Sequence, residues 1–240
     1  MGFRNVSRAD VDLSSGINLL ACENGVGKPA ILEAIYLLAR GRSFRTTQSK
    51  QLIRHGDDEL VVRAEVDTGQ MVHRLARGKS RGGETKAKID GESAHKQSRF
   101  AELLPLQTLL PGIADLVLDG PSIRREFVDW GLFHVEHQYL EISRRYRKAL
   151  GQRSAWLREG HDGTFDKDPW AQDIAKQGAL INHRRKGFVA SLDQQTRRIF
   201  AALGAELEVQ LIYHGAGDTE DAAAAMVQLA ESYKRDLRHG

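Results

Sequence analysis

Cysteine is almost absent from this chain of 240 residues, because Cys22 is the only one. A single cysteine excludes an internal disulfide framework and fits a reducing compartment. No apolar run approaches the roughly 18 residues that a membrane helix needs, and the N-terminus lacks the apolar stretch of a secretory signal. We therefore expect a cytoplasmic protein with no membrane partner.

A large excess of one charge is also missing. The chain has 35 Lys and Arg against 32 Asp and Glu, a net charge of +3. Such a small surplus does not identify a nucleic-acid binder, because the footprint of one is local clustering of basic residues. With 41% hydrophobic residues a packed core is expected, in one large domain or two modest ones.

The pattern of residues changes near Trp130. Before it, short apolar runs alternate with glycine-rich breaks, whereas after it a helical period dominates. The first part predicts a helix at 29–38 and strands at 17–21, 59–66, 71–76 and 87–89. The second predicts helices from about 135 to 157, from 168 to about 203 and from 218 onward, with a short strand at 207–211. The prediction is an α/β head over 1–122 and a mainly helical arm lobe over 123–240.

One segment carries a nucleotide-binding signature between the predicted buried strand at 17–21 and the following helix. It consists of Cys22, Glu23, Asn24, Gly25, Val26, Gly27, Lys28 and Pro29. This context and spacing approach the phosphate-binding loop G-x-x-x-x-G-K-[ST], in which backbone amides converge on the phosphates and the lysine reaches the β- and γ-oxygens. An ordinary strand-to-helix turn with a surface lysine is the alternative, and we favour the phosphate loop.

Two positions depart from that motif. Cys22 replaces the first glycine and would be strained if its φ were positive. Pro29 replaces the Ser or Thr whose hydroxyl binds Mg²⁺, and it has no N–H to donate. Losing one charge-assisted hydrogen bond costs about 1.5–3 kcal/mol, so we expect ATP binding to be weak or absent.

Other candidate motifs favour ordinary structure. The run 116–119 ends in Asp119 like a Walker B strand, but Gly120 and Pro121 follow without a second acid, so we predict a turn. His134 and His137 lie three apart with no further ligand nearby, so we expect no metal site. Arg125 and Asp129 have the spacing of an ordinary i, i+4 ion pair.

The chain resembles the RecF family of bacterial recombination mediators in several blocks spread over its first 155 residues. They are Phe3-Arg4-Asn5, Ile17-Asn18-Leu19-Leu20, Ile31-Leu32-Glu33-Ala34-Ile35-Tyr36, Gly41-Arg42-Ser43-Phe44-Arg45, Arg54-His55, Gly120-Pro121, Arg124-Arg125-Glu126-Phe127-Val128-Asp129-Trp130, Tyr146-Arg147-Lys148-Ala149-Leu150 and Gln152-Arg153. The resemblance implies a P-loop ABC-type ATPase head, related to chromosome-maintenance ATPases, with a helical arm. The family's signature motif and Walker B strand come late in the chain and have no counterpart here, so we expect an incomplete head.

The resemblance also implies a function in DNA repair, replication and recombination, including the SOS response. Its implied ligands are ATP with Mg²⁺ and single-stranded or gapped DNA. Its implied partners are recombination mediator and recombinase proteins and a second copy in an ATP-dependent homodimer. The family is a weak DNA-dependent ATPase, but we do not expect this chain alone to be catalytically competent. A non-catalytic, truncated remnant or scaffold without nucleotide is the alternative, and a phosphotransferase using the loop is less favoured.

A basic cluster follows the loop helix and is the candidate DNA contact. Its members are Arg40, Arg42, Arg45, Lys50 and Arg54. Such cations could neutralise phosphates or simply form a solvated helix end; the residues leave the choice even, and the resemblance favours DNA. Further cations of the arm leave a solvated face and a phosphate track equally open: Arg144, Arg145, Arg147, Lys148, Arg184, Arg185 and Lys186.

Overall fold

The computed structural model describes residues 2–23, 25–110, 115–136, 138–159, 164–215 and 219–239. Its contacts divide the chain into two units, Met1–Leu109 and Leu110–Gly240. The sequence placed the division at 122/123 instead. The stretch from 110 belongs with the second unit because its helix α3 (Asp115–Leu118) contacts α4 (Pro121–Val135).

The first unit is built on an antiparallel sheet in the order β1-β2-β3-β4. Its strands are β1 (Glu59–Asp67), β2 (Val72–Ser80), β3 (Thr85–Ile89) and β4 (Glu92–Ser93). Asp90 and Gly91 join the last two with positive φ of 54° and 91°, the conformation that a tight hairpin turn requires. The strands predicted at 59–66, 71–76 and 87–89 are confirmed, although β2 runs further than its apolar residues suggested.

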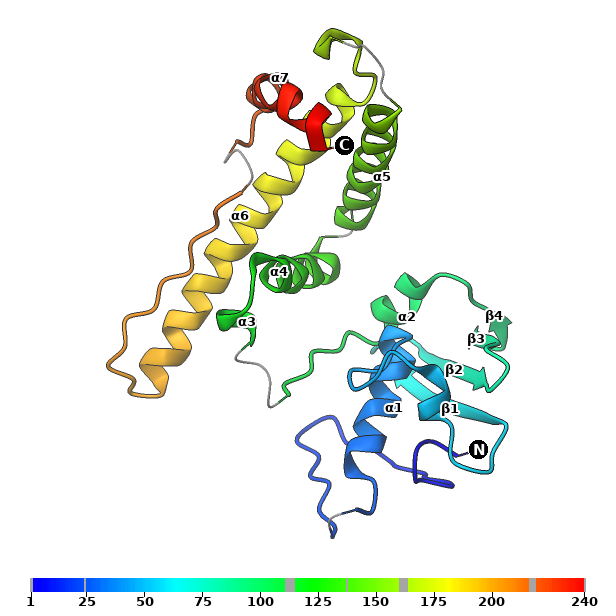
Figure 1. Ribbon diagram of the computed structural model, residues 1–240. Helices are drawn as coiled ribbons and strands as arrows, with labels where there is room; N and C mark the ends of the chain where they lie inside the picture. The colour runs from blue at the N-terminus through cyan, green and yellow to red at the C-terminus, as the bar shows by residue number, and fades with distance from the viewer. Residues whose placement is uncertain are drawn as a thin grey trace. The chain divides into compact units, whose positions relative to one another are not determined.

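Helices α1 (Lys28–Arg40) and α2 (Gln97–Leu103) cover one face of this sheet (Figure 1). Leu37 of α1 packs on Leu60 of β1, and Leu38 packs with Leu75 of β2 and Phe100 of α2. A short 3₁₀ helix, η1 (Ser49–Leu52), adds Leu52 to the same core. Adjacent α1 residues therefore fill two clusters, which fixes the rotation of the helix against the sheet.

The buried strand predicted at 17–21 is wrong. These residues form no strand, and Ile17 and Leu19 are 100% and 87% exposed. A strand needs a partner for its backbone N–H and C=O groups, and no described strand lies beside this segment. The strand predicted at 207–211 is likewise absent, for the same reason.

The second unit is helical and is organised along α6 (Ala171–Ala202). Helices α4, α5 (Tyr139–Arg158) and α7 (Ala222–His239) contact α6, and a 3₁₀ turn, η3 (Phe165–Lys167), lies between α5 and α6 (Figure 1). The chain then turns back along α6, where the Leu211 amide donates to Asp193 at 2.6 Å and the Tyr213 hydroxyl donates to Asn182 at 2.8 Å. No described helix is both long and apolar enough to cross a membrane.

Four of the seven arm cations considered for a phosphate track face carboxylates of their own unit: Arg145, Arg184, Arg185 and Lys186. Asp129 accepts hydrogen bonds from Arg185 of α6, at 2.8 and 2.9 Å, and from the Tyr139 hydroxyl. The expected Arg125–Asp129 pair is therefore wrong, because a partner from another helix takes the carboxylate. Three further pairs lie between segments distant in sequence: Arg145–Asp173, Arg184–Glu136 and Lys186–Glu220, at 2.8, 3.0 and 2.7 Å. This favours the solvated-face interpretation over a phosphate track.

A buried ion cluster ties α7 to the rest of the second unit. Arg153 of α5 is 7% exposed at its side chain; its Nε donates to the fully buried Asp168 at 2.5 Å, and its Nη1 donates to Asp236 of α7 at 2.9 Å. Two carboxylates around one guanidinium compensate its desolvation only while both remain.

Asp168→Ala should therefore destabilise the second unit by about 3–5 kcal/mol, because it leaves the buried Arg153 short of a counter-charge. Urea unfolding followed by tryptophan fluorescence measures this unit alone, since Trp130, Trp156 and Trp170 all lie in it. The matched control is Asp173→Ala, which removes a half-exposed partner of Arg145 and should change the midpoint far less. Equal shifts of the urea midpoint for the two variants would contradict a stabilising role of the buried Arg153 ion cluster.

Candidate nucleotide and nucleic-acid binding site

In the described part of the segment 22–29, residues 22–23 and 25–26 are exposed, Gly27 is buried and Lys28 begins α1. Gly25 and Gly27 have φ of 88° and 113°, conformations that side chains disfavour. Gly27 also has no room for a Cβ, which would lie 2.6 Å from the Val6 side chain. The loop therefore requires glycine at position 27 for two reasons, conformation and space.

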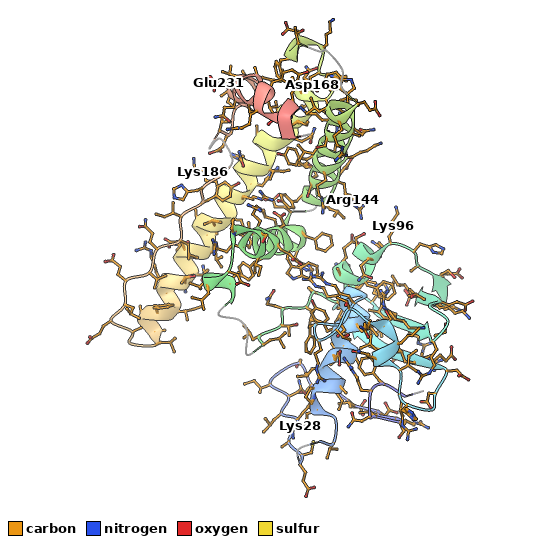
Figure 2. All side chains as sticks on the ribbon, in the orientation of Figure 1. Lys28, Lys96, Arg144, Asp168, Lys186 and Glu231 are labelled. Atoms are coloured by element: carbon orange, nitrogen blue, oxygen red, sulfur yellow. The ribbon has the colours of Figure 1, made fainter. Side chains whose placement is uncertain are left out.

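The described backbone amides between 25 and 31 fall into two groups, those with a protein acceptor and those without one. The amides of Ala30 and Ile31 donate to the Gly27 carbonyl, at 2.9 and 3.2 Å, whereas the amides of 25–28 have no partner in the described part of the chain. Lys28 lies at the N-terminal end of α1 (Figure 2), and its ammonium donates to the carbonyls of Cys22 and Glu23. Free amides, a helix N-terminus and a lysine together can hold an anion.

The two unusual residues of the loop cause no strain in the fold. Cys22 is exposed and is not among the described residues with positive φ, so the strain considered for it does not arise. Pro29 is the second residue of α1, where a missing N–H leaves no helical hydrogen bond unmade. Position 29 nevertheless offers a bound phosphate neither an amide nor a hydroxyl. Asn24, also predicted to bind nucleotide, lies outside the described residues.

The N-terminal segment holds this loop in place. The Asn5 side-chain amide donates to the Gly25 carbonyl at 2.7 Å. Arg4 precedes it with a φ of 57°, which a non-glycine residue adopts only when the surroundings impose it. Its amide donates to the Leu52 carbonyl at 2.8 Å, and Phe3 and Val6 bond each other across the turn. No role for Arg4 or Asn5 in the site was predicted from the sequence.

Glu33 of α1 joins this N-terminal turn to the basic segment after the helix. Its side chain is fully buried and accepts hydrogen bonds from Arg4 Nε at 2.9 Å, Arg4 Nη2 at 2.6 Å and the Ser43 hydroxyl. Arg45 Nη1 lies 3.7 Å away. Burial opposes ionisation, but the bonds from Arg4 and Ser43 and the charges of both arginines hold the pKa of Glu33 below its ordinary value. The site is therefore organised around an ionised buried carboxylate.

The predicted DNA contacts all lie on the segment that runs from the end of α1 to Arg54. Arg40 ends α1 with its guanidinium 5.9 Å from the Tyr36 ring, Arg42 and Lys50 are exposed, and the half-exposed Arg54 lies 4.0 Å from Asp57. The Arg54 amide donates to the Gly2 carbonyl at 3.2 Å, which closes the segment back onto the N-terminus. The fold thus gathers these cations in the unit that contains the loop.

Two basic residues of β2 near this segment were not predicted from the sequence. Arg77 and Lys79 alternate with Leu75 on the face of the sheet that the helices cover, opposite Val62 and Leu60 of β1. The predicted strand stopped at 76, where the apolar residues end. The period-2 pattern continuing through 77 and 79 was the signal that could have identified them.

The run 116–119 is no Walker B strand. Residues up to Leu118 form α3, and the carbonyl of Asp119 accepts from Arg124 at 2.6 Å. The described residues contain no group of three side chains that could hold a metal ion.

Comparisons with known proteins agree across the chain. The RecF/RecN/SMC N-terminal domain family matches residues 1–115. The chain is 35% identical over 239 residues to the DNA replication and repair protein RecF of Aliivibrio fischeri, covering 99% of this chain and 66% of the relative. Its counterpart in Shewanella oneidensis is 35% identical over 240 residues, with 99% and 65% covered. The chain thus spans slightly less than two thirds of the length of these relatives.

Two solved structures share the fold. One, of the recombination mediator protein RecF with ATP in the RecFOR pathway, superposes with a TM-score of 0.83 at 22% identity and covers 99% of this chain and 66% of its own. The other, described as RecF with ATPrS in the same pathway, has a TM-score of 0.79 at 23% identity, with 99% and 67% covered. They confirm the predicted fold, an α/β head with a mainly helical lobe.

Glu33→Gln should destabilise the first unit by about 3 kcal/mol at neutral pH, because Arg4 loses its buried counter-charge. A carboxyl whose pKa is lower in the folded chain stabilises the fold above its unfolded pKa of about 4.5, and that stability disappears as pH falls through the folded value. Below about pH 4.5 the unsubstituted chain should therefore lose stability more steeply than the variant. Denaturant-dependent hydrogen exchange of peptides from α1 measures both effects.

The control for that experiment is Arg45→Gln. Arg45 is 49% exposed at its side chain and lies 3.7 Å from the carboxylate, so its loss should leave the exchange of α1 nearly unchanged. Destabilisation equal to that of Glu33→Gln would show that the cluster is not centred on Arg4.

Proposed function

Because this chain belongs to the RecF family, we propose that it is a RecF-type DNA repair and replication protein that binds DNA beside a nucleoside triphosphate site. The observation that carries the proposal is the loop at 25–28, whose four amides have no protein partner in the described residues and which ends at Lys28. Its link through Asn5 and Glu33 to the basic segment supports a coupled binding surface. Single-stranded or gapped DNA is the proposed ligand, and recombinase loading is the process it serves.

Nucleotide binding in this proposal is weak. The loop amides and Lys28 fit the β- and γ-phosphates of ATP, the nucleotide named with the related solved structure. They do not fit the accompanying Mg²⁺, because Pro29 and Ala30 provide no hydroxyl. When bound, the triphosphate would supply negative charge that displaces Lys28 from the carbonyls of Cys22 and Glu23.

DNA binding in this proposal rests on the segment 40–54. Arg42 and Lys50 are exposed, and Arg45 is held beside Glu33 with half of its side chain in solvent. Cations presented on a rigid scaffold neutralise phosphates and release counterions, which gives affinity without sequence preference. The arm's cations contribute less, since many of them face carboxylates of their own unit.

A non-catalytic scaffold is the second candidate function. Two observations favour it. Pro29 stands in the loop, and the run considered as a Walker B strand forms the helix α3 up to Leu118. For either function, the proposed partners are proteins of the recombination pathway and a second copy of the chain joined by ATP.

Pro29→Thr should raise the affinity for ATP with Mg²⁺ by about ten- to a hundredfold, because it restores an amide donor and a hydroxyl. Isothermal titration calorimetry measures the change. Pro29→Ala separates the two contributions, since it restores the amide alone and should recover only part of the gain, without dependence on Mg²⁺. Micromolar affinity of the unsubstituted chain for ATP would refute the proposal that its nucleotide binding is weak.

Arg42→Ala and Arg45→Ala should each weaken binding to single-stranded DNA and reduce the slope of log affinity against log salt by about 0.7. Fluorescence anisotropy over a salt series gives both quantities. Arg63→Ala is the matched control, because Arg63 is an exposed arginine of β1 in the same unit but outside the basic segment. Affinity that does not vary with salt would count against DNA as the ligand.

A further inference from the structure

The inward face of β2 carries two cations where a core would ordinarily continue. Leu75 on this face is 1% exposed, and Leu60, which pairs with Lys79, is 0% exposed. Burying a cation costs free energy because its charge is desolvated. The presence of Arg77 and Lys79 on this face therefore calls for a compensating interaction.

Arg77 finds its compensation within the protein. Its Nη2 donates to Gln97 Oε1 at 2.7 Å, and its guanidinium lies 4.4 Å from the centroid of the Phe100 ring. Gln97 in turn donates to the Ala39 carbonyl, so Arg77 lies at the negative end of the α1 dipole. Only its Nε is buried without a partner. Arg77 is thus a structural cation of the core.

Lys79 has no comparable compensation. Its ammonium carries three donors, and its one contact in the described chain is the Ser49 hydroxyl at 3.3 Å. Neither Lys79 nor Arg77 takes part in an ion pair between described residues. Burial and the neighbouring charge of Arg77 lower the pKa of Lys79. The surroundings of Lys79 therefore favour an anion.

A cavity of about 360 Å³ lies beside Lys79. It is lined by Tyr36 of α1 and by Arg42, Phe44 and Thr46 of the following segment. The Tyr36 and Phe44 rings meet edge to face with centroids 5.2 Å apart and form an aromatic wall. The volume is within the range of small-ligand pockets, and the lining combines cations and hydroxyls with flat apolar surface.

We propose that this cavity binds one nucleotide unit, with its phosphate on Lys79 and Arg42 and its base against Tyr36 and Phe44. The inference rests on the proposed DNA-binding function, since Arg42 belongs to the same basic segment. A base inside a duplex is stacked and paired, so only an unpaired nucleotide can enter. A single-stranded DNA segment and a free nucleotide share this chemistry.

The test is Lys79→Met in the full chain, with a short labelled oligothymidylate as the probe. Its affinity should fall about tenfold, and the salt slope should decrease by about 0.7. Lys79→Arg should retain binding. Lys88→Met is the matched control, because Lys88 is exposed on the opposite face of the same sheet, and it should leave affinity unchanged.

Thermal stability separates a binding lysine from a structural one. Lys79→Met should melt at the same temperature as the unsubstituted chain or higher, because it removes a desolvated charge. A lysine required for folding would instead lower the melting temperature together with DNA affinity, and that result would overturn the inference.

Two further probes identify the source of the nucleotide. Weaker binding of the oligothymidylate alone assigns the cavity to single-stranded DNA, and weaker binding of a fluorescent ATP analogue alone assigns it to a free nucleotide. Unchanged affinity of Lys79→Met for both probes, while Arg45→Ala outside the cavity lining still weakens DNA binding, would overturn the cavity proposal and leave the proposed function standing. An unsubstituted chain that binds neither probe would overturn both proposals.

Discussion

The buried carboxylate of Glu33 is the interaction on which the rest of the first unit depends. One helix residue bonds Arg4 of the N-terminal turn and Ser43 of the basic segment, which are distant in sequence. Because an isolated buried charge is costly, the three groups stabilise one another only when all are in place. The same turn contains Arg4 in a left-handed conformation and Asn5, whose side chain bonds the loop.

The described residues 25–29 combine the backbone of a phosphate-binding loop with a proline at the position where that motif has a hydroxyl. Gly27 is required by both conformation and space, and Lys28 stands at the start of α1. Pro29 fits the first turn of a helix well, so folding does not select against it, although it removes an amide and a hydroxyl from the side that would meet phosphate. In the proposed function, fold stability and ligand affinity thus impose different demands on position 29.

Cations of the two units are used differently. In the second unit, Arg145, Arg153 and Arg185 face carboxylates and join helices to one another. In the first unit, Lys79 is half-buried beside a cavity without such a partner in the described chain, and Arg42 lines the same cavity. The number of basic residues therefore says little about nucleic-acid binding, whereas their pairing says more.

Sequence alone determined the features that depend on neighbours along the chain. The helix at 28–40, the Asp90–Gly91 hairpin, the long helices of the arm and the glycine-lysine loop all follow from local conformation and periodicity. Tertiary structure decided the features that depend on distant partners. The pattern at 17–21 predicts a strand, but no described strand pairs with it. Asp129 bonds Arg185 of another helix instead of Arg125. The burial of Glu33 and Lys79 was likewise hidden, because desolvation is a property of the packed chain and not of a residue's neighbours in sequence.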